Sequence, residues 1–244
     1  MPKFFVPREN IDGDTIRIGG EDVVHIKRVL RMREGDTLNM CDSSGCDYLA
    51  KIREIGEKDI FLDVLEKKKS ETEPPVKVTL FQGIPKAGKM DYIIQKTTEL
   101  GIFEIVPSVL SRCVVKLDGD KKIKRWQKIS EEAAKQSGRG IIPEIKEPMN
   151  LKEAIEELKK FDLAFVPYEC EEENCLRDIL KSKDDIKTVG FMIGPEGGFE
   201  KSEIDLLVEN GITPISLGKR ILRTETAGEA VLSMVMYEIG DINS

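Results

Sequence analysis

The sequence predicts an α/β protein in which a small β-rich N-terminal domain precedes a larger domain built on a parallel sheet. Short β-leaning segments separated by turns fill the first part of the chain, and strands alternate with helices after it. A charged stretch with a Pro-Pro pair, residues 67–76, reads as a linker between the two regions. A chain of 244 residues can hold two domains that each bury a core. We therefore expect domains over residues 1–72 and 73–244.

The N-terminal region has the pattern of a small barrel or curled sheet. Its β-leaning segments at residues 36–45, 46–56 and 59–68 are separated by Ser-Ser-Gly and Gly-Glu-Lys turns. One helix, residues 21–32, interrupts this pattern and ends before Glu34-Gly35-Asp36.

After the linker, strand and helix alternate six times. The expected helices, each preceded by a β-leaning run, cover residues 89–102, 122–138, 151–161, 175–182, 201–211 and 226–240. This order predicts a largely parallel sheet covered by helices on both faces. In such sheets ligands bind outside the carboxyl ends of the strands.

Composition excludes several classes of protein. No run approaches the roughly 18 apolar residues of a membrane span, and the N-terminus has no signal-peptide core, so we expect a cytoplasmic protein without a membrane partner. Five cysteines, an odd number, suit a reducing compartment. Their spacings are not those of zinc sites, and His25 is the only histidine, so we expect no metal. GxSxG and HExxH motifs are absent as well, which disfavours hydrolase and zinc-protease chemistry.

Charge is distributed unevenly. Residues 73–150 carry 14 Lys and Arg against 10 Asp and Glu, whereas residues 151–244 carry 11 against 20. Within residues 112–139, nine basic residues surround the only tryptophan, Trp126. A solvated helix face is the commoner meaning of such a run, so alone it is a weak indication of a polyanionic partner.

Two loops at expected strand ends stand out. The first, Ile193–Phe199, reads IGPEGGF, and a tight turn without a ligand would explain its glycines. It matches neither a Walker A motif nor GxGxxG, and Glu196 stands where a phosphate would favour lysine. The second, Leu217–Ala227, reads LGKRILRTETA and enters a helix at Thr226 with Glu229 in a capping-box position. Arg223 beside Glu225 in this apolar setting either neutralises it or faces a substrate.

Five segments together resemble the RsmE family of the SPOUT superfamily, whose members are ribosomal RNA methyltransferases. They are HIKRVLRMREGD, GKMDYIIQKTTELG, SRCVVKL, IGPEGGF and LGKRILRTETA, in order over nearly the whole chain. The last two are individually specific. One departure is Glu200, where relatives often have Ser or Thr at the helix start, and Ser202 would cap that helix instead.

The resemblance implies a fold, a reaction and partners. It implies a PUA-like β-barrel followed by a domain whose C-terminal segment forms a trefoil knot, and a homodimer. The apolar stripe Val231, Leu232, Val235 and Met236 could contribute to the dimer, although core packing explains it equally well. The reaction would be transfer of a methyl group from S-adenosylmethionine to N3 of one uridine, called U1498, in the 16S rRNA of the small ribosomal subunit.

The resemblance also assigns site residues. The candidate cofactor residues are Gly194, Glu196, Gly197 and Gly198 on one wall and Leu217, Gly218, Ile221, Leu222 and Thr226 on the other. Glu225 is the candidate base that takes the N3 proton, and Arg223 is the candidate that stabilises the negative charge developing on the uracil ring. In the competing view Arg223 only orients Glu225 or RNA. The candidate RNA-binding residues are Arg8, Arg28 and Arg31, the last two on one helix face, and Lys86, Lys89, Arg112 and Arg139.

Two other functions remain open at this point. The chain could be a non-catalytic RNA-binding module that kept the fold, although the intact loops count against it. It could instead methylate another RNA, such as a tRNA. The target base, and the choice between naked RNA and the assembled subunit, do not follow from the residues.

Overall fold

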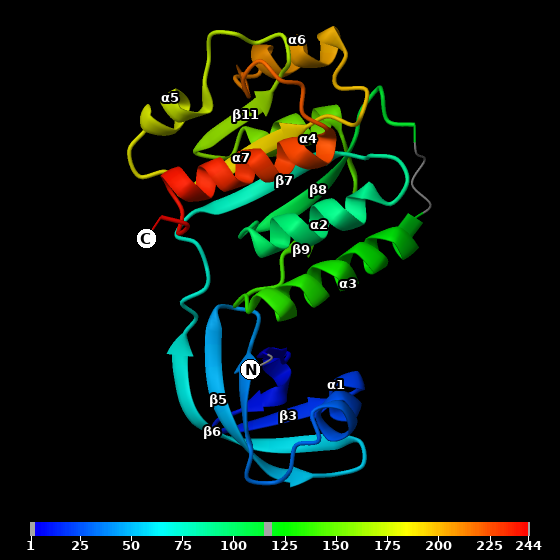
Figure 1. The fold of residues 1–244 in the computed structure, drawn as a ribbon, viewed down its shortest axis with the longest axis vertical. Coiled ribbons are helices and arrows are strands. Elements are labelled where there is room, and N and C mark those ends of the chain that lie inside the picture. Colours follow the sequence, from blue (N-terminus) through cyan, green and yellow to red (C-terminus); the bar gives the residue numbers. More distant parts are fainter. Residues whose placement is uncertain (1–2, 115–118, 244) are drawn as a thin grey trace. The chain divides into compact units, whose positions relative to one another are not determined.

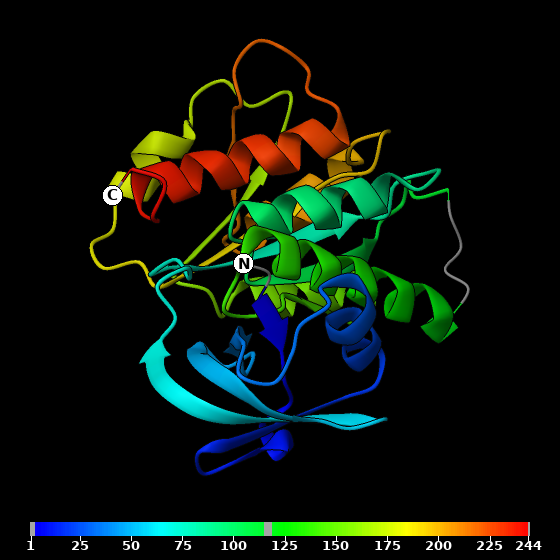
Figure 2. The ribbon, with the colours of Figure 1, turned by 60° about the horizontal axis from the view of Figure 1, so that its bottom comes forward.

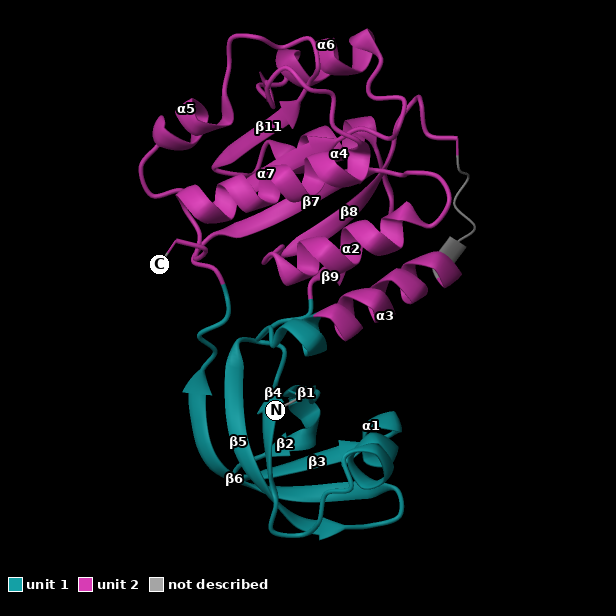
Figure 3. Ribbon diagram, in the orientation of Figure 1, with its two compact units in different colours: residues 1–73, 134–142 teal, residues 74–133, 143–244 magenta. Residues whose placement is uncertain are grey.

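The computed structural model describes residues 3–114 and 119–243 of the chain. It divides into two compact units, coloured separately in Figure 3. Unit 1 combines residues 1–73 with residues 134–142, and unit 2 combines residues 74–133 with residues 143–244. The predicted boundary between residues 72 and 73 does not anticipate that segment 134–142 packs with the N-terminal unit.

Unit 1 is a curled six-stranded sheet. Its strands are β1 (Lys3–Phe5), β2 (Ile11–Asp12), β3 (Thr15–Gly19), β4 (Thr37–Cys41), β5 (Cys46–Ile55) and β6 (Asp59–Lys69), in the order β1-β4-β5-β6-β3-β2. The pairs are antiparallel except β1 with β4. The register between β5 and β6 shifts at two places, and such bulges bend a sheet around its core. Alternating apolar residues such as Leu38, Met40, Ile60 and Leu62 fill that core.

Two elements of unit 1 differ from the sequence prediction. The single predicted helix is a short α1 (Glu21–Val24) continued by a π-helical turn, η2 (His25–Val29). Arg31 then has a positive φ of 54° and lies outside the helix, so it does not share a helix face with Arg28 as predicted. Strand β6 extends to Lys69, which places the first residues of the predicted linker in the sheet.

Glu73 holds segment 134–142 to unit 1. Its carboxylate accepts hydrogen bonds from Arg139 and from the backbone N–H groups of Gly140 and Ile141. The buried thiol of Cys41 donates to the Gly140 carbonyl at 2.8 Å, and burial raises its pKa to about 12. All five cysteines are free thiols, as expected.

Unit 2 is built on a parallel sheet with the order β10-β8-β7-β12-β11-β13, to which β9 adds beside β8. Figure 1 labels β7, β8, β9 and β11 of this sheet. Its strands are β7 (Lys77–Gly83), β8 (Glu104–Val109), β9 (Glu144–Ile145), β10 (Met149–Asn150), β11 (Leu163–Pro167), β12 (Thr188–Ile193) and β13 (Thr213–Ile215). All their pairings are parallel, which confirms the predicted sheet. Both faces are covered, so every residue of β7 after Lys77 is buried, and β12 is buried after Thr188.

Helices cover both faces of this sheet. They are α2 (Lys89–Glu99), α3 (Gly119–Ser137), α4 (Leu151–Leu158), α5 (Leu176–Lys181), α6 (Lys201–Glu209) and α7 (Thr224–Glu238). Helices α2, α3, α5 and α7 contribute to one apolar cluster, and α4 and α6 to the cluster on the opposite face. Helix α7 runs beside α2 (Figure 2). No helix in the described part of the chain is long and apolar enough to cross a membrane.

The apolar stripe of α7 belongs to the core. Val231, Leu232, Val235 and Met236 are fully buried in the first cluster. Of the two explanations given for the stripe, core packing is therefore correct. The trefoil knot remains a prediction from the resemblance.

Candidate functional site

The loops predicted to form the site follow two strands of the unit 2 sheet. The glycine loop follows β12, and the second loop follows β13 and leads into α7. Strand β11 lies between β12 and β13, so the segment after it, Tyr168–Cys170, reaches the same edge between the two predicted loops. The carboxylate of Glu169 lies over Gly198, since a Cβ there would be 3.3 Å from Oε1. Sequence analysis missed this third loop because it has no glycines and the strand order is not written in the sequence.

Close backbone approach explains the glycines of the first loop. Gly198 has a φ of +67°, and its N–H donates to the Pro195 carbonyl. A Cβ on Gly194 would lie 3.1 Å from backbone carbons of Gly198, and one on Gly83, at the end of β7, would lie 2.7 Å from Pro195. The ends of β7 and β12 are therefore packed backbone to backbone.

A buried polar network ties α7 to these strand ends. The Thr224 hydroxyl donates to the Gly194 carbonyl at 2.6 Å and accepts from Gln82 Nε2 at 2.9 Å. Thr224 and Gln82 are both buried, so these hydrogen bonds are shielded from water. The helix begins at Thr224, with Arg223 at the N-cap position, so the predicted start at Thr226 with a Thr226–Glu229 capping box is wrong.

Lys89 joins two carboxylates at this edge. Its Nζ lies 3.1 Å from Glu196 Oε1 and 3.4 Å from Glu225 Oε2. The Lys86 backbone N–H also donates to both carboxylate oxygens of Glu196, at 3.1 and 3.3 Å. Burial works to raise the pKa of Glu196, but backbone hydrogen bonds and Lys89 outweigh it and lower that pKa. The Glu196 carboxylate is therefore committed to the protein.

These contacts bear on two predictions. The cation that pairs with Glu225 is Lys89, so of the two alternatives given for Arg223, neutralisation of Glu225 is not what the structure shows. Lys89 lies between the glycine loop and the first turn of α7, and its contact with RNA stays a prediction.

Arg112 forms hydrogen bonds to the glycine loop and to the residue that follows it. Its Nη1 donates to the Gly197 carbonyl at 2.6 Å, and its Nε donates to Glu200 Oε1 at 2.9 Å. Arg112 is therefore part of the loop's own structure, and because its side chain is still 41% exposed, its contact with RNA stays a prediction. Glu200 is the N-cap residue of α6, and Glu203 accepts from its N–H at 2.9 Å, so the predicted cap by Ser202 is wrong.

The second loop divides into packed and exposed residues. Leu217 and Leu222 pack against the core, and Gly218 has a φ of +90°. Ile221, predicted to line the cofactor, is 87% exposed. Thr226 is exposed within α7 and lines a groove between α7 and α2.

The cations of the second loop have no protein partners among the described residues. Lys219, Arg220 and Arg223 are exposed, and neither a hydrogen bond nor an ion pair joins their side chains to the described part of the chain. They are available for an anionic ligand.

The remaining RNA candidates differ in accessibility. Arg8, Arg28, Arg31 and Lys86 are exposed. Arg139 is 4% exposed, and its Nη2 lies 2.7 Å from Glu73 Oε2. A buried guanidinium bound in this way is unavailable to RNA, which contradicts the prediction for Arg139.

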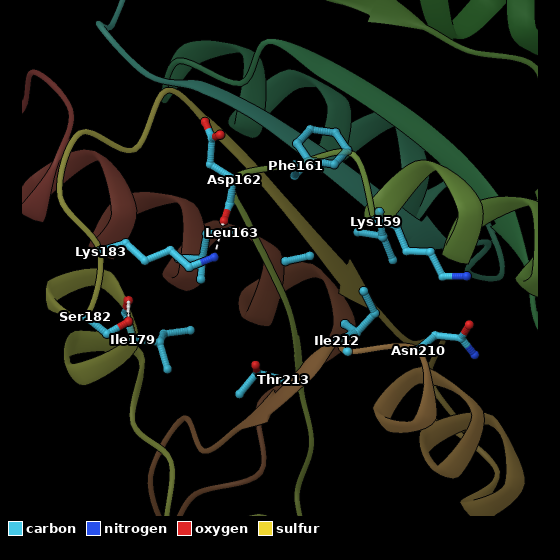
Figure 4. Close-up of a pocket in the computed structure, with 13 residues that line it drawn as sticks. Lys159, Phe161, Asp162, Leu163, Ile179, Ser182, Lys183, Asn210, Ile212 and Thr213 are labelled. Atoms are coloured by element: carbon cyan, nitrogen blue, oxygen red, sulfur yellow. Dashed lines mark hydrogen bonds between the residues drawn. The ribbon is translucent and has the colours of Figure 1, made fainter.

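A cavity of about 320 Å³ lies away from these loops (Figure 4). It opens at the amino ends of β11 and β13, where Asp162, Lys183 and Thr213 line it. Lys183 Nζ donates to the Asp162 carbonyl at 2.6 Å, so its ammonium is already used to close the turn. Ligands of parallel sheets bind at the opposite ends of the strands, so we do not assign this cavity to the site. No cluster of His, Cys, Asp and Glu that could hold a metal occurs within residues 3–114 and 119–243.

Two family models match the chain. One, described as an RNA methyltransferase domain, matches residues 72–236, and the other, described as an RNA methyltransferase PUA domain, matches residues 18–65. Ribosomal RNA small subunit methyltransferase E of Bacillus subtilis is 35% identical over 249 residues, which cover 98% of this chain and 97% of that protein. The enzyme of the same name from Aquifex aeolicus is 33% identical and covers 92% of this chain and 95% of that protein.

Solved structures agree with these sequence matches. Ribosomal RNA small subunit methyltransferase E from Neisseria gonorrhoeae, bound to S-adenosylmethionine, superimposes with a TM-score of 0.89 at 30% identity over 99% of both chains. A putative methyltransferase from Legionella pneumophila, also in complex with that cofactor, gives a TM-score of 0.86 at 33% identity over 98% of both chains. The chain therefore belongs to the ribosomal RNA small subunit methyltransferase E family, the RsmE family.

Proposed function

We propose that this protein transfers the methyl group of S-adenosylmethionine to N3 of one uridine in the 16S rRNA of the small ribosomal subunit. One observation carries the proposal. The glycine loop, the second loop and Glu225 lie at the carboxyl edge of one parallel sheet, in a chain that matches RsmE proteins over nearly its whole length.

The residues present fit S-adenosylmethionine better than a phosphate-bearing nucleotide. The glycine loop has no lysine placed to cradle phosphates, and it carries the carboxylate of Glu196 instead. In the second loop, the backbone N–H groups of Ile221 and Leu222 have no acceptor among the described residues, so they can donate to a nucleoside. We assign Gly194, Gly197, Gly198, Leu217, Gly218 and Leu222 to the pocket. Glu196 shapes the loop through Lys89 and Lys86.

When bound, the cofactor supplies an electrophilic methyl group on a sulfonium. In the transfer the sulfur–methyl bond breaks as the N3–methyl bond forms, and the N3 proton leaves to a base. Glu225, in the first turn of α7, is our candidate to accept that proton. Lys89 holds this carboxylate from one side, and the free guanidinium of Arg223 can face the negative charge that develops on the uracil ring.

The proposal includes a homodimer that acts in the cytoplasm, where the small ribosomal subunit is found. The dimer surface cannot be the buried stripe of α7, so we place it on the outer side of α7 and α2. That side exposes Tyr92, Met234 and Tyr237 and contains a groove of about 470 Å³. Exposed aromatic residues and methionine are typical of such interfaces.

Nucleoside analysis of 16S rRNA tests the proposed function. A strain lacking this gene should lose one 3-methyluridine, and the purified protein should restore it on small subunits from that strain. Loss of a tRNA methylation instead would establish the alternative substrate, and absence of any cofactor binding in calorimetry would favour a non-catalytic RNA-binding module.

Glu225→Gln tests the assigned base. A true base should change both the single-turnover rate and its dependence on pH, while cofactor affinity stays the same. Gly197→Val would test the cofactor pocket less cleanly. A Cβ on Gly197 would lie 3.2 Å from Arg112, so a loss of cofactor binding could also come from displacement of Arg112.

A further inference from the structure

The second loop presents an isoleucine to solvent in a basic setting. Ile221 is 87% exposed, although Leu217 and Leu222 in the same loop pack against the core. Lys219, Arg220 and Arg223 surround it in sequence, and their side chains have no partner among the described residues. An apolar side chain gains free energy only when something covers it. Three free cations beside it indicate that the covering ligand is a polyanion.

The chemistry of the proposed reaction specifies what part of an RNA would cover Ile221. N3 lies on the Watson–Crick edge of uracil, which base pairing hides from an enzyme, while stacking on neighbouring bases holds the nucleotide inside the RNA. Enzymes that modify such atoms take the nucleotide out of its stack, and nucleic-acid-binding proteins insert apolar side chains between bases to do so. Ile221 lies four residues before Glu225, at the entrance to α7. A wedge at this position would open the stack next to the candidate base.

We propose that Ile221 is the wedge that separates the target uridine from its stacked neighbour, while Lys219 and Arg220 hold the flanking phosphates. The inference rests on the proposed function and adds how the substrate base is reached. It moves Ile221 from the cofactor wall, where the resemblance placed it, to the RNA side of the loop. Its backbone N–H remains free to face the cofactor.

Ile221→Ser tests the wedge directly. A side chain that contacts RNA only after the base leaves its stack stabilises the extruded state, so its loss lowers kcat and leaves binding of the small subunit unchanged. We expect kcat on small subunits from the deletion strain to fall about tenfold or more, with KM within about twofold. Ile221→Phe should restore the rate. Lys219→Ala combined with Arg220→Ala should raise KM instead, because these residues act in binding.

Val208→Ser is the matched control, since it removes an exposed apolar side chain from α6 outside the loops. It should leave kcat and KM unchanged. The wedge is refuted if Ile221→Ser keeps the rate of this control. Weaker cofactor binding in calorimetry would return Ile221 to the cofactor wall, and an altered oligomeric state in sedimentation would make it a subunit contact. If the wild-type protein does not methylate small subunits, the proposed function is wrong, and this outcome differs from an active wild-type protein whose Ile221→Ser variant keeps the rate.

Discussion

Lys89, a candidate RNA-binding residue from the sequence, forms ion pairs with two carboxylates of the protein. It bridges Glu196, from the loop after β12, and Glu225, from the first turn of α7. The hydrogen bond to Glu196 raises the pKa of Lys89, so the ammonium remains charged throughout the neutral range. A cation in this position keeps two carboxylates from repelling each other and fixes the orientation of the candidate base.

Lys89→Met should therefore slow methyl transfer. Without the cation the two carboxylates repel each other and Glu225 loses its orientation. We therefore expect the single-turnover rate to fall by up to about tenfold. The melting temperature should change little, because the ion pairs are partly exposed. Lys96→Met, which breaks the pair with Glu99 on the same helix, is the control and should keep the wild-type rate. A normal rate in Lys89→Met would show that the bridge has no role in the reaction.

At the level of elements, the start of α7 depends on the Thr224 hydroxyl. It is the only side chain in the described residues that links Gln82 at the end of β7 with the Gly194 carbonyl after β12. Thr224→Val keeps the shape but removes the donor to the Gly194 carbonyl and one of the two acceptors of Gln82 Nε2, which still donates to the Gly83 carbonyl. This loss should cost about 1–3 kcal/mol of unfolding free energy. Calorimetry should show a lower melting temperature and weaker cofactor binding, because the glycine loop loses its anchor.

Thr226→Val is the control for this substitution on the same helix. Its side chain is exposed, so the unfolding free energy should stay nearly unchanged. The same variant examines the prediction that Thr226 binds the cofactor, because a direct contact would lower affinity without lowering stability. Equal melting temperatures for the two variants would mean that the Thr224 network contributes nothing.

Glu229, on the outer side of α7, makes stability depend on pH. Its Oε1 is buried without a hydrogen-bond partner, and burial raises the pKa of this carboxyl although Lys96 opposes the shift. The folded state therefore favours the protonated form, and stability falls as pH rises through the range where the unfolded carboxyl ionises. Glu229→Gln should raise the melting temperature at pH 7 by about 2 °C and give no gain near pH 4.

The control for Glu229 is Glu99→Gln. Lys96 holds the Glu99 carboxylate at 2.9 and 3.1 Å, so removing that charge should not stabilise the protein at pH 7. Melting curves of both variants at several pH values give the comparison. A gain for Glu229→Gln that is as large at pH 4 as at pH 7 would contradict the explanation from ionisation.

Periodicity predicted the helices well where local sequence determines them. The predicted helix 201–211 corresponds to α6 (Lys201–Glu209), but α7 begins two residues before the predicted Thr226 because Thr224 takes part in hydrogen bonds to distant strands. The roles of charged residues were harder to predict. Arg112 and Arg139 look alike in the sequence, yet their partners Glu200 and Glu73 are 88 and 66 residues away. Only the folded chain shows that both arginines have structural partners and that Arg139 alone of the two is buried.

For the whole molecule, each of the two units must hold its own segments together. Unit 1 includes the distant segment 134–142 through the buried pair of Arg139 with Glu73. Arg139→Met should leave a carboxylate in a largely buried place without its cation, at a cost of about 3–5 kcal/mol. The melting temperature should fall by several degrees, while RNA binding of the folded protein stays normal. If Arg139→Met instead bound RNA more weakly and kept the wild-type melting temperature, Arg139 would be an RNA-binding residue after all.

RNA binding should instead depend on exposed arginines that have no structural partner. Arg28 and Arg31 are exposed, and neither side chain forms a hydrogen bond or an ion pair with the described residues. Each phosphate contact releases counterions, so each lost contact lowers the slope of log affinity against log salt by roughly one. Arg28→Ala combined with Arg31→Ala should lower that slope by about two in titrations of small subunits at several salt concentrations, with no change in melting temperature. Arg53→Ala, an exposed arginine that pairs with Asp63, is the control and should keep the wild-type slope. An unchanged slope in the double variant would move the RNA surface away from η2 to other basic residues.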